Sequence, residues 1–135
     1  MKKKSTEEIV FEIQERLQKL PFVLVLILGR IHSPYRELAK QLSEKIPATI
    51  VDFEELSHLL SSSQKGVYLF LKEDLEEDWI PYDYLIVVDI DSKLQQKRAS
   101  EEELRVWIPT QEGDFASHRM EEKADAIWLN DEKNI

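Results

Sequence analysis

The side chains best suited to chemistry lie in one short stretch, between an apolar run and an amphipathic segment. They follow Gly29 in the order Arg30, His32, Ser33 and Arg36. A turn at the start of a helix offers backbone N–H groups to an anion, and guanidinium groups strengthen that attraction. Two interpretations stay open: a small anion site made by these residues, or a surface turn with solvated side chains. The second is favoured, because charged residues are mostly exposed.

The spacing around this turn is that of a phosphate-binding P-loop, but the chemistry differs at three positions. A P-loop reads G-x-x-x-x-G-K-[ST], and its last three positions are held here by Pro34, Tyr35 and Arg36. Proline lacks a backbone N–H and cannot take the positive φ that glycine allows. Tyrosine brings no charge to the phosphates, and arginine replaces the hydroxyl that would ligate magnesium. We therefore expect no ATP binding and no cofactor.

Three carboxylates at the ends of expected strands are weaker candidates. Asp52 is the only positional candidate for a catalytic residue, as a general base or metal partner, and it also suits the N-cap of a helix beginning at Glu54. Asp89 and Asp91 could form a magnesium pair. Capping and solvation are favoured for all three, because no suitable lysine or further magnesium ligand accompanies them. The histidines are too scattered to predict a metal site.

An aromatic cluster lies in the acidic connection between two expected strands. It consists of Trp79, Ile80 and Tyr82. Exposed aromatic side chains often mark protein-binding surfaces. These residues are therefore candidates for a partner surface, although tryptophan is more often found in or beside a core.

Composition narrows the classes of partner. The chain has 135 residues, enough for one domain with a normal core, and a net charge of −9. Such a charge repels nucleic acid and anionic lipid, so we expect neither as a partner. The sequence holds no cysteine, which excludes disulfides and cysteine nucleophiles and fits a cytoplasmic location. The longest apolar run, Phe22 to Leu28, is too short to cross a membrane.

The elements that position these residues alternate between helix and strand. A capping box at 5–8 opens a helix that ends before Pro21, and a second helix is expected over 34–45, with Ser33 as its cap and Pro34 at its first position. Further helices are expected at 54–61, 92–98 and from 100 to Pro109, with residues 110–123 unassigned. Strands are expected at 22–28, 48–53, 67–71, 84–89 and 126–129. Residues 1–4 and 130–135 are expected to be a basic and a polar tail.

This alternation predicts the fold class. The strand at 22–28 is apolar at every position, as expected for a strand covered on both faces of a parallel sheet. Apolar strands that alternate with amphipathic helices are typical of an α/β fold with helices on both faces. We expect a single domain built on an open, parallel, five-stranded sheet.

Five segments of the chain, in order, resemble one family. Residues 28–42 read LGRIHSPYRELAKQL, and the later segments are IVDF (50–53), YDYLIVVD (82–89), WIPTQE (107–112) and ADAI (124–127). The uridine kinase-like P-loop kinases, of the phosphoribulokinase and pantothenate kinase group, typically read D-G-R-x-x-S-G-K-[ST]-L-A-x-x-L at the first of these places. The other four segments are similar to the family's later strands and closing segment. Lys97 and Arg98 stand where the family carries basic lid residues.

The resemblance implies a P-loop NTPase-like sheet of order 2-3-1-4-5 with the strand at 22–28 in its centre. It also implies a phosphate site at residues 29–36 and a substrate region between the second and third strands. The chain departs from the family at both places, since its Walker A residues are replaced and residues 53–67 leave room for only one short helix.

Three hypotheses about function follow. The leading one is a non-catalytic, pseudoenzyme-like protein that acts through protein binding or self-association. The alternative is a small nucleotide- or phosphate-binding enzyme with an unconventional anion site at residues 29–36. A third possibility is an unrelated flavodoxin-like or receiver-like module.

Overall fold

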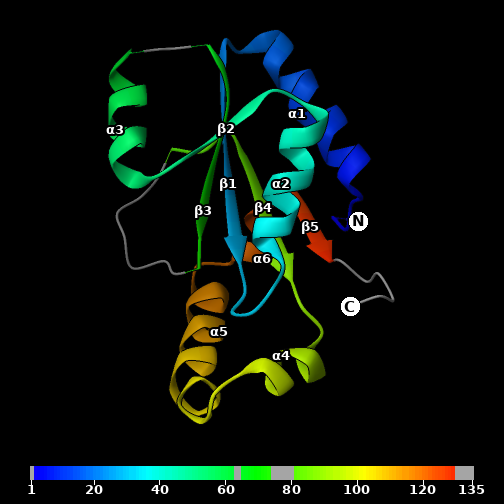
Figure 1. The fold of residues 1–135 in the computed structure, drawn as a ribbon, viewed down its shortest axis with the longest axis vertical. Helices are drawn as coiled ribbons and strands as arrows, with labels where there is room; N and C mark the ends of the chain where they lie inside the picture. Colours follow the sequence, from blue (N-terminus) through cyan, green and yellow to red (C-terminus); the bar gives the residue numbers. More distant parts are fainter. Residues whose placement is uncertain (1, 63–64, 74–80, 130–135) are drawn as a thin grey trace.

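The computed structural model describes residues 2–62, 65–73 and 81–129, and it contains an open sheet of five parallel strands in the order β2-β3-β1-β4-β5 (Figure 1). The strands are β1 (Phe22–Gly29), β2 (Ala48–Val51), β3 (Gly66–Lys72), β4 (Tyr84–Asp89) and β5 (Ala126–Leu129). The predicted fold class, strand order and central β1 are confirmed. This topology does not by itself identify a P-loop NTPase.

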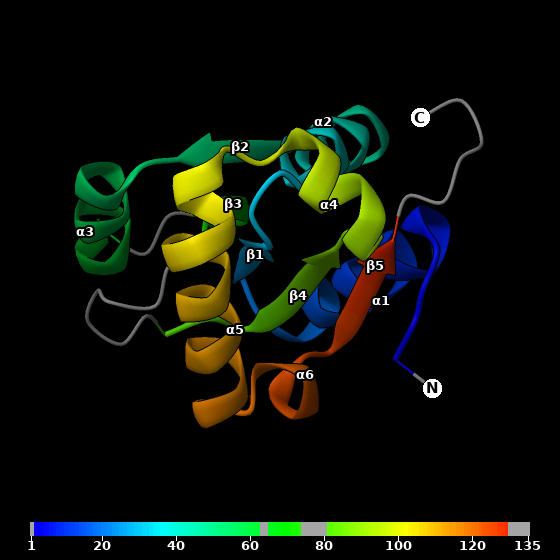
Figure 2. The ribbon, with the colours of Figure 1, turned by 90° about the horizontal axis from the view of Figure 1, so that it is seen from below.

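Helices cover both faces of the sheet (Figure 2). They are α1 (Thr6–Lys19), α2 (Tyr35–Lys45), α3 (Phe53–Ser62), α4 (Ser92–Arg98), α5 (Ile108–Ser117) and α6 (Met120–Lys123), with a π-helix (Glu103–Trp107) directly before α5. Buried side chains of α1 and α2 pack on one face. Side chains of α3, α5 and α6 pack on the other. Among the described residues, no helix is long and apolar enough to cross a membrane.

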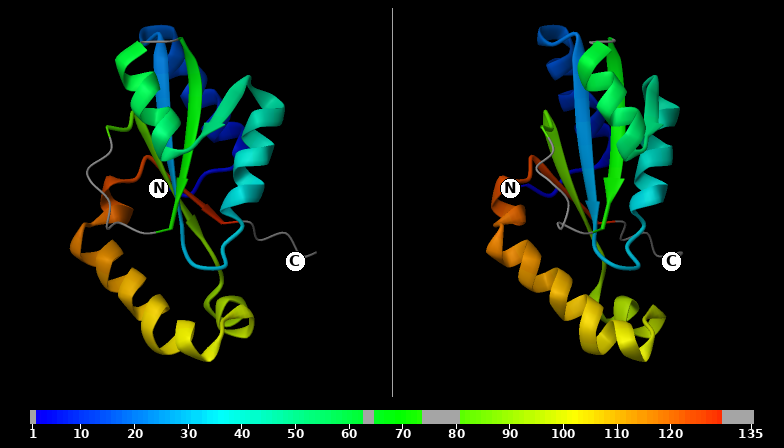
Figure 3. Two further views of the ribbon diagram at one scale, coloured as in Figure 1. Left: turned by 60° about the vertical axis from the view of Figure 1, so that its left-hand side comes forward. Right: turned by 90° about the vertical axis from the view of Figure 1, so that its left-hand side faces the viewer.

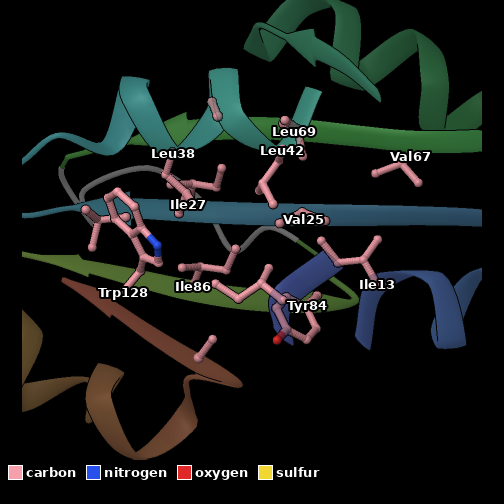
Figure 4. Packing of buried hydrophobic residues seen from close by; sticks show 14 of the residues in the cluster. Ile13, Val25, Ile27, Leu38, Leu42, Val67, Leu69, Tyr84, Ile86 and Trp128 are labelled. Carbon is pink, nitrogen blue, oxygen red and sulfur yellow. The ribbon is translucent and has the colours of Figure 1, made fainter. Parts of the chain in front are cut away.

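The strand β1 is apolar throughout because alternate side chains enter two separate cores. Val25 and Ile27 point to the face of α1 and α2, where Figure 4 shows them among Ile13, Leu38 and Tyr84. The other side of the strand enters the second core through Leu24, Leu26 and Leu28. Burial on both faces explains why no polar residue interrupts this strand.

The helix caps predicted near Ser5, Asp91 and Ser100 are confirmed. In each of them the side chain binds a backbone amide no more than three residues away. The Ser5 hydroxyl accepts from the Glu8 amide at 3.2 Å while the Glu8 carboxylate accepts from the Ser5 amide at 2.9 Å. The Asp91 carboxylate accepts from two amides at the start of α4, both at 3.1 Å. The second capping box, between Ser100 and Glu103, is also present.

Several predicted element boundaries differ from the structure by one or two residues, and two of these differences change the role of a residue. Pro34 is the N-cap of α2 rather than its first helical residue, and the Ser33 hydroxyl makes no capping hydrogen bond. The strand β2 ends at Val51 rather than Phe53, because Asp52 caps α3 and Phe53 is already helical.

Pro109 does not end a helix, contrary to the prediction. The chain continues from the π-helix into α5, and Ile108 donates its amide to the carbonyl of Glu103, five residues back. A proline inside an α-helix clashes with the carbonyl four residues back and leaves one bond unmade. The wider turn of a π-helix accommodates such an irregularity, and the Thr110 hydroxyl donates to the Val106 carbonyl at 2.6 Å. Residues 110–123, which the sequence left unassigned, are therefore mostly helical.

Gly113 lies inside α5 without a structural reason for glycine. A Cβ atom built there meets no heavy atom within 4 Å. We expect Gly113→Ala to raise the free energy of unfolding by roughly 0.5–1 kcal/mol, because alanine loses less backbone entropy in a helix. Urea denaturation of the two proteins measures this difference. A destabilised variant would show that α5 is not a regular helix at this position.

Residues 2–4 lie along β5 rather than forming a solvated basic tail. Lys3 forms a parallel bridge with Ile127, whose amide donates to the Lys2 carbonyl at 2.8 Å. The Lys4 ammonium contacts both carboxylate oxygens of Glu12 at 2.7 Å. The segment thereby covers part of an edge whose backbone groups would otherwise lack strand partners. The polar tail predicted at 130–135 lies outside the described residues.

The helices α4 and α5, with the π-helix between them, project beyond the carboxyl ends of the strands (Figures 1 and 3). We call residues 92–117 the arm. The loop between β1 and α2, which carries the predicted anion site, lies at the same end of the sheet (Figure 1). Polar contacts between this loop and the arm decide what the site can do.

Candidate functional site

The β1–α2 loop leaves the sheet through a tight turn. The Arg30 amide donates to the Val88 carbonyl at 3.1 Å, and the Ser33 amide donates back to the Arg30 carbonyl at 2.8 Å. His32 adopts a left-handed backbone with φ of 69°. Such a conformation is uncommon for residues other than glycine, although histidine adopts it more readily than most. The turn directs successive backbone groups of the loop toward α4 and α5, where they find partners.

Arg30 is bound by carboxylates from three different elements. Its Nε lies 2.6 Å from Asp89 at the end of β4, a terminal nitrogen lies 2.6 Å from Glu121 of α6, and the other contacts Glu112 of α5. The guanidinium also lies 4.8 Å from the Phe115 ring centroid. Only 8% of the residue is exposed. Arg30 therefore joins elements of its own chain and has little capacity left for an external anion.

The Arg30 side chain stays in its charged form. Burial lowers the pKa of the guanidinium, but the carboxylates of Glu112 and Asp89 outweigh it, so the net pKa lies above its ordinary value. A buried cation with three carboxylate partners is a strong structural junction, because removing it leaves those carboxylates uncompensated.

Two buried glutamines bind the backbone of the loop. The Gln111 side-chain oxygen accepts from the Ile31 amide at 2.9 Å, and its nitrogen donates to the carbonyls of Gly29 and Glu73 at 3.0 and 2.6 Å. The Gln95 side chain donates to the Ile31 carbonyl at 2.9 Å. A P-loop would offer amides such as that of Ile31 to a phosphate. Here the side chain of Gln111, which belongs to the arm, already accepts the hydrogen bond of that amide.

Gly29 is required by a neighbouring ring. A Cβ atom on Gly29 would lie 2.2 Å from Cδ1 of Tyr35, which is impossible without movement. Tyr35 is buried, and burial together with the Glu73 carboxylate raises the pKa of its phenol. The position where a P-loop carries its lysine thus holds a buried aromatic ring, and the glycine that matched the motif makes room for it.

The other residues of the predicted anion site differ in their contacts and in their exposure. The His32 Nε2 lies 2.9 Å from Glu103 Oε1, which ties the loop to the π-helix. This contact, followed by the hydrogen bond from the Ser100 backbone, lowers the pKa of the Glu103 carboxyl. Arg36 is exposed, with its guanidinium 5.3 Å from the Tyr35 ring centroid. Ser33 is buried, and its hydroxyl has no hydrogen-bond partner in the part of the chain that the structure describes.

The other predicted candidates have structural partners. The Asp52 carboxylate accepts from the Glu55 amide at 2.7 Å, so it caps α3. Asp89 binds Arg30 and Asp91 caps α4. In residues 2–62, 65–73 and 81–129 no group of three or more histidine, aspartate or glutamate side chains could hold a metal ion.

The predicted partner surface is only partly described. Trp79 and Ile80 lie outside the described residues. Tyr82 is half-buried and packs against the second core, and burial followed by the nearby Asp125 raises the pKa of its phenol. Tyr82 is therefore attached to the core on at least one side.

A cavity of about 270 Å³ lies beside Arg30, on the side of α5 and α6. It is lined by Arg30, Glu112, Phe115, Ala116, Arg119, Glu121 and Glu122. Arg30 is held by carboxylates at this wall, and Arg119 lies 3.9 Å from Glu122. The lining contains three glutamates and two arginines, and both arginines already contact glutamates. No surplus positive charge is therefore left for a phosphate here.

The glutamines that close the loop were not found from sequence. Gln111 and Phe115 are four residues apart and both buried, so they share one face of α5. That spacing was a usable signal, but it required recognising a helix that continues past Pro109. Gln95 lies in a short helix whose apolar pattern is too weak to show which residues are buried.

Comparisons with protein family models, with curated proteins and with solved structures gave no match to the chain. The resemblance to uridine kinase-like P-loop kinases therefore rests on the sequence motifs.

Proposed function

We propose that this chain is a non-catalytic protein, shaped like a P-loop kinase, that acts through protein binding or self-association. The observation that supports the proposal is the closed β1–α2 loop. Gln111 occupies the Ile31 amide, and three carboxylates occupy Arg30. The groups that would contact a nucleotide in such a loop already serve to hold the arm on the sheet.

A phosphate at this loop would have to displace those contacts. Moving Gln111 away leaves the carbonyls of Gly29 and Glu73 without this partner, at a cost of about 1–3 kcal/mol for each buried group left unsatisfied. The carboxylates of Asp89, Glu112 and Glu121 around Arg30 also repel a phosphate. Neither cost is offset by a P-loop lysine, whose place Tyr35 takes.

The experiment is a melting curve with and without magnesium and ATP or GTP. A ligand present at about ten times its dissociation constant stabilises a fold by about 1.4 kcal/mol, which shifts the melting temperature by a few degrees. We expect no shift with either nucleotide at about 5 mM, since the loop offers no free cradle. A magnesium-dependent shift would overturn the proposal.

A second function has one observation in its favour. The buried Ser33 hydroxyl has no described partner and lies just before α2, whose first turn carries the exposed Arg36. This arrangement supports a small phosphate- or nucleotide-binding enzyme with an unconventional anion site. Inorganic phosphate in the same melting experiment distinguishes the two functions, because a shift abolished by both Ser33→Ala and Arg36→Ala would favour the enzyme.

We further propose that the protein works in the cytoplasm and has no nucleic acid partner. Support comes from the cysteine-free composition and the net charge of −9.

A further inference from the structure

The arm carries apolar side chains that its own chain leaves exposed. No residue of the π-helix is buried. Trp107 is 49% exposed, Leu104 43% and Val106 37%. Large apolar residues concentrated on one projecting segment differ from the scattered exposed side chains that any surface has, and tryptophan is among the residues that contribute most to protein interfaces.

The same segment is acidic. Residues 101–114 contain five acidic side chains, Glu101, Glu102, Glu103, Glu112 and Asp114, and one basic side chain, Arg105, which gives a net charge of −4. Glu103 and Glu112 bind the loop through His32 and Arg30, whereas Glu101 and Glu102 are exposed. The exposed charged residues nearest the apolar side chains in sequence are therefore Glu101 and Glu102, which are negative, and Arg105, which is positive. We call residues 101–114 the acidic apolar segment.

Charge complementarity selects the kind of partner. Complementary potentials favour association, and like charges placed together oppose it. A second copy would bring together two chains that each have a net charge of −9 and expose Glu101 and Glu102 on this segment, so the segment suits a partner of opposite charge better than itself. The segment is helical over about 14 residues, or roughly 20 Å, which matches a helix of similar length lying beside it.

We propose that the acidic apolar segment binds a basic amphipathic helix of a partner protein, with Trp107 and Leu104 against its apolar face and Glu101 and Glu102 facing its lysines or arginines. This inference rests on the proposed function of protein binding and names the partner's chemistry. It also gives the arm a role beyond closing the loop: polar contacts at its base hold it, and its outer part stays available.

The experiment uses two synthetic peptides of about 18 residues, one with leucine and lysine at helical spacing and one with leucine and glutamate at the same positions. Fluorescence anisotropy of the labelled peptides measures binding to the full chain. We expect the leucine–lysine peptide to bind and the leucine–glutamate peptide not to bind. The double variant Leu104→Ser, Trp107→Ser should weaken binding by at least about ten-fold, because it removes the apolar anchors.

The matched control is Phe11→Ser. Phe11 is 62% exposed and belongs to α1. This helix lies away from the arm (Figure 1), so the loss of Phe11 should leave binding unchanged. Equal weakening by Phe11→Ser, equal binding of both peptides, or no binding of the leucine–lysine peptide would each overturn the proposal. Light scattering adds one more outcome: a wild-type dimer that Leu104→Ser, Trp107→Ser dissociates would assign the segment to a second copy instead. If the peptide fails to bind while nucleotides cause no melting shift, this inference fails and the proposed function stands.

Discussion

Replacing Arg30 with alanine should lower the free energy of unfolding by about 3 kcal/mol. Breaking a buried ion pair from one side typically costs roughly 3–5 kcal/mol, because the partner charge stays without compensation. Here three carboxylates lose their partner, but about half of the Glu112 and Glu121 side chains is exposed to water, which favours the lower end of the range. Urea denaturation measures the difference.

The matched control for this prediction is Arg36→Ala. Arg36 is exposed six residues away, so its loss should change stability by no more than about 0.5 kcal/mol. Arg30→Lys should fall between the two, since lysine keeps the charge but cannot bind several carboxylates through a planar fork. If Arg30→Ala and Arg36→Ala cost the same, Arg30 is not the junction between the loop, β4, α5 and α6.

Gly29→Ala should also destabilise the fold, by about 3 kcal/mol. The added methyl group would lie 2.2 Å from Tyr35 Cδ1 and 2.8 Å from its Cβ, so the start of α2 must move as well as the ring. Overpacking of a tight core typically costs about 1–3 kcal/mol. The expected value lies at the upper end, since this contact involves the part of the side chain nearest the backbone.

A double-mutant cycle identifies the cause. In a Tyr35→Ala background the two closest contacts, with the ring, are gone and only the contact with Cβ at 2.8 Å remains, so Gly29→Ala should cost less than it does in the wild-type chain. The two stabilities are again measured with urea. An equal cost in both backgrounds would show that the tyrosine ring is not what excludes a methyl group at position 29.

Sequence patterns that span only a few residues correctly predicted the central strand and several helix caps. The unbroken apolar run of β1 identified a central strand, and Ser5, Asp52 and Asp91 each cap a helix that begins within three residues. Caps and burial patterns depend on neighbours in the sequence or on the period of a strand, so one chain is sufficient to read them.

The candidate site depended on contacts that the sequence does not display. Arg30 and Glu121 are 91 residues apart and Ile31 and Gln111 are 80 apart. Nothing in the local pattern shows that a charged loop residue will be neutralised by its own chain. The edge pairing of residues 2–4 with β5 is similarly remote, because Lys3 and Ile127 are joined only by the tertiary fold.

The prediction that a helix ends at Pro109 failed for a different reason. A proline usually ends a helix, and the prediction followed that rule. The chain instead widens into a π-helix and continues. This irregularity hid α5, and with it the Gln111 side chain that closes the loop.

The backbone amide of Ile31 offers the most direct test of the claim that the chain closes its own β1–α2 loop. Assigned nitrogen–proton correlation spectra report the environment of this amide and of the Gln111 side-chain amide while magnesium and ATP are added, to about 5 mM. We expect both signals to stay in place, and the Ile31 amide to exchange slowly with solvent, because Gln111 accepts its hydrogen bond at 2.9 Å. A saturable, magnesium-dependent movement of the Ile31 signal would show that the loop opens to nucleotide, and it would contradict the account.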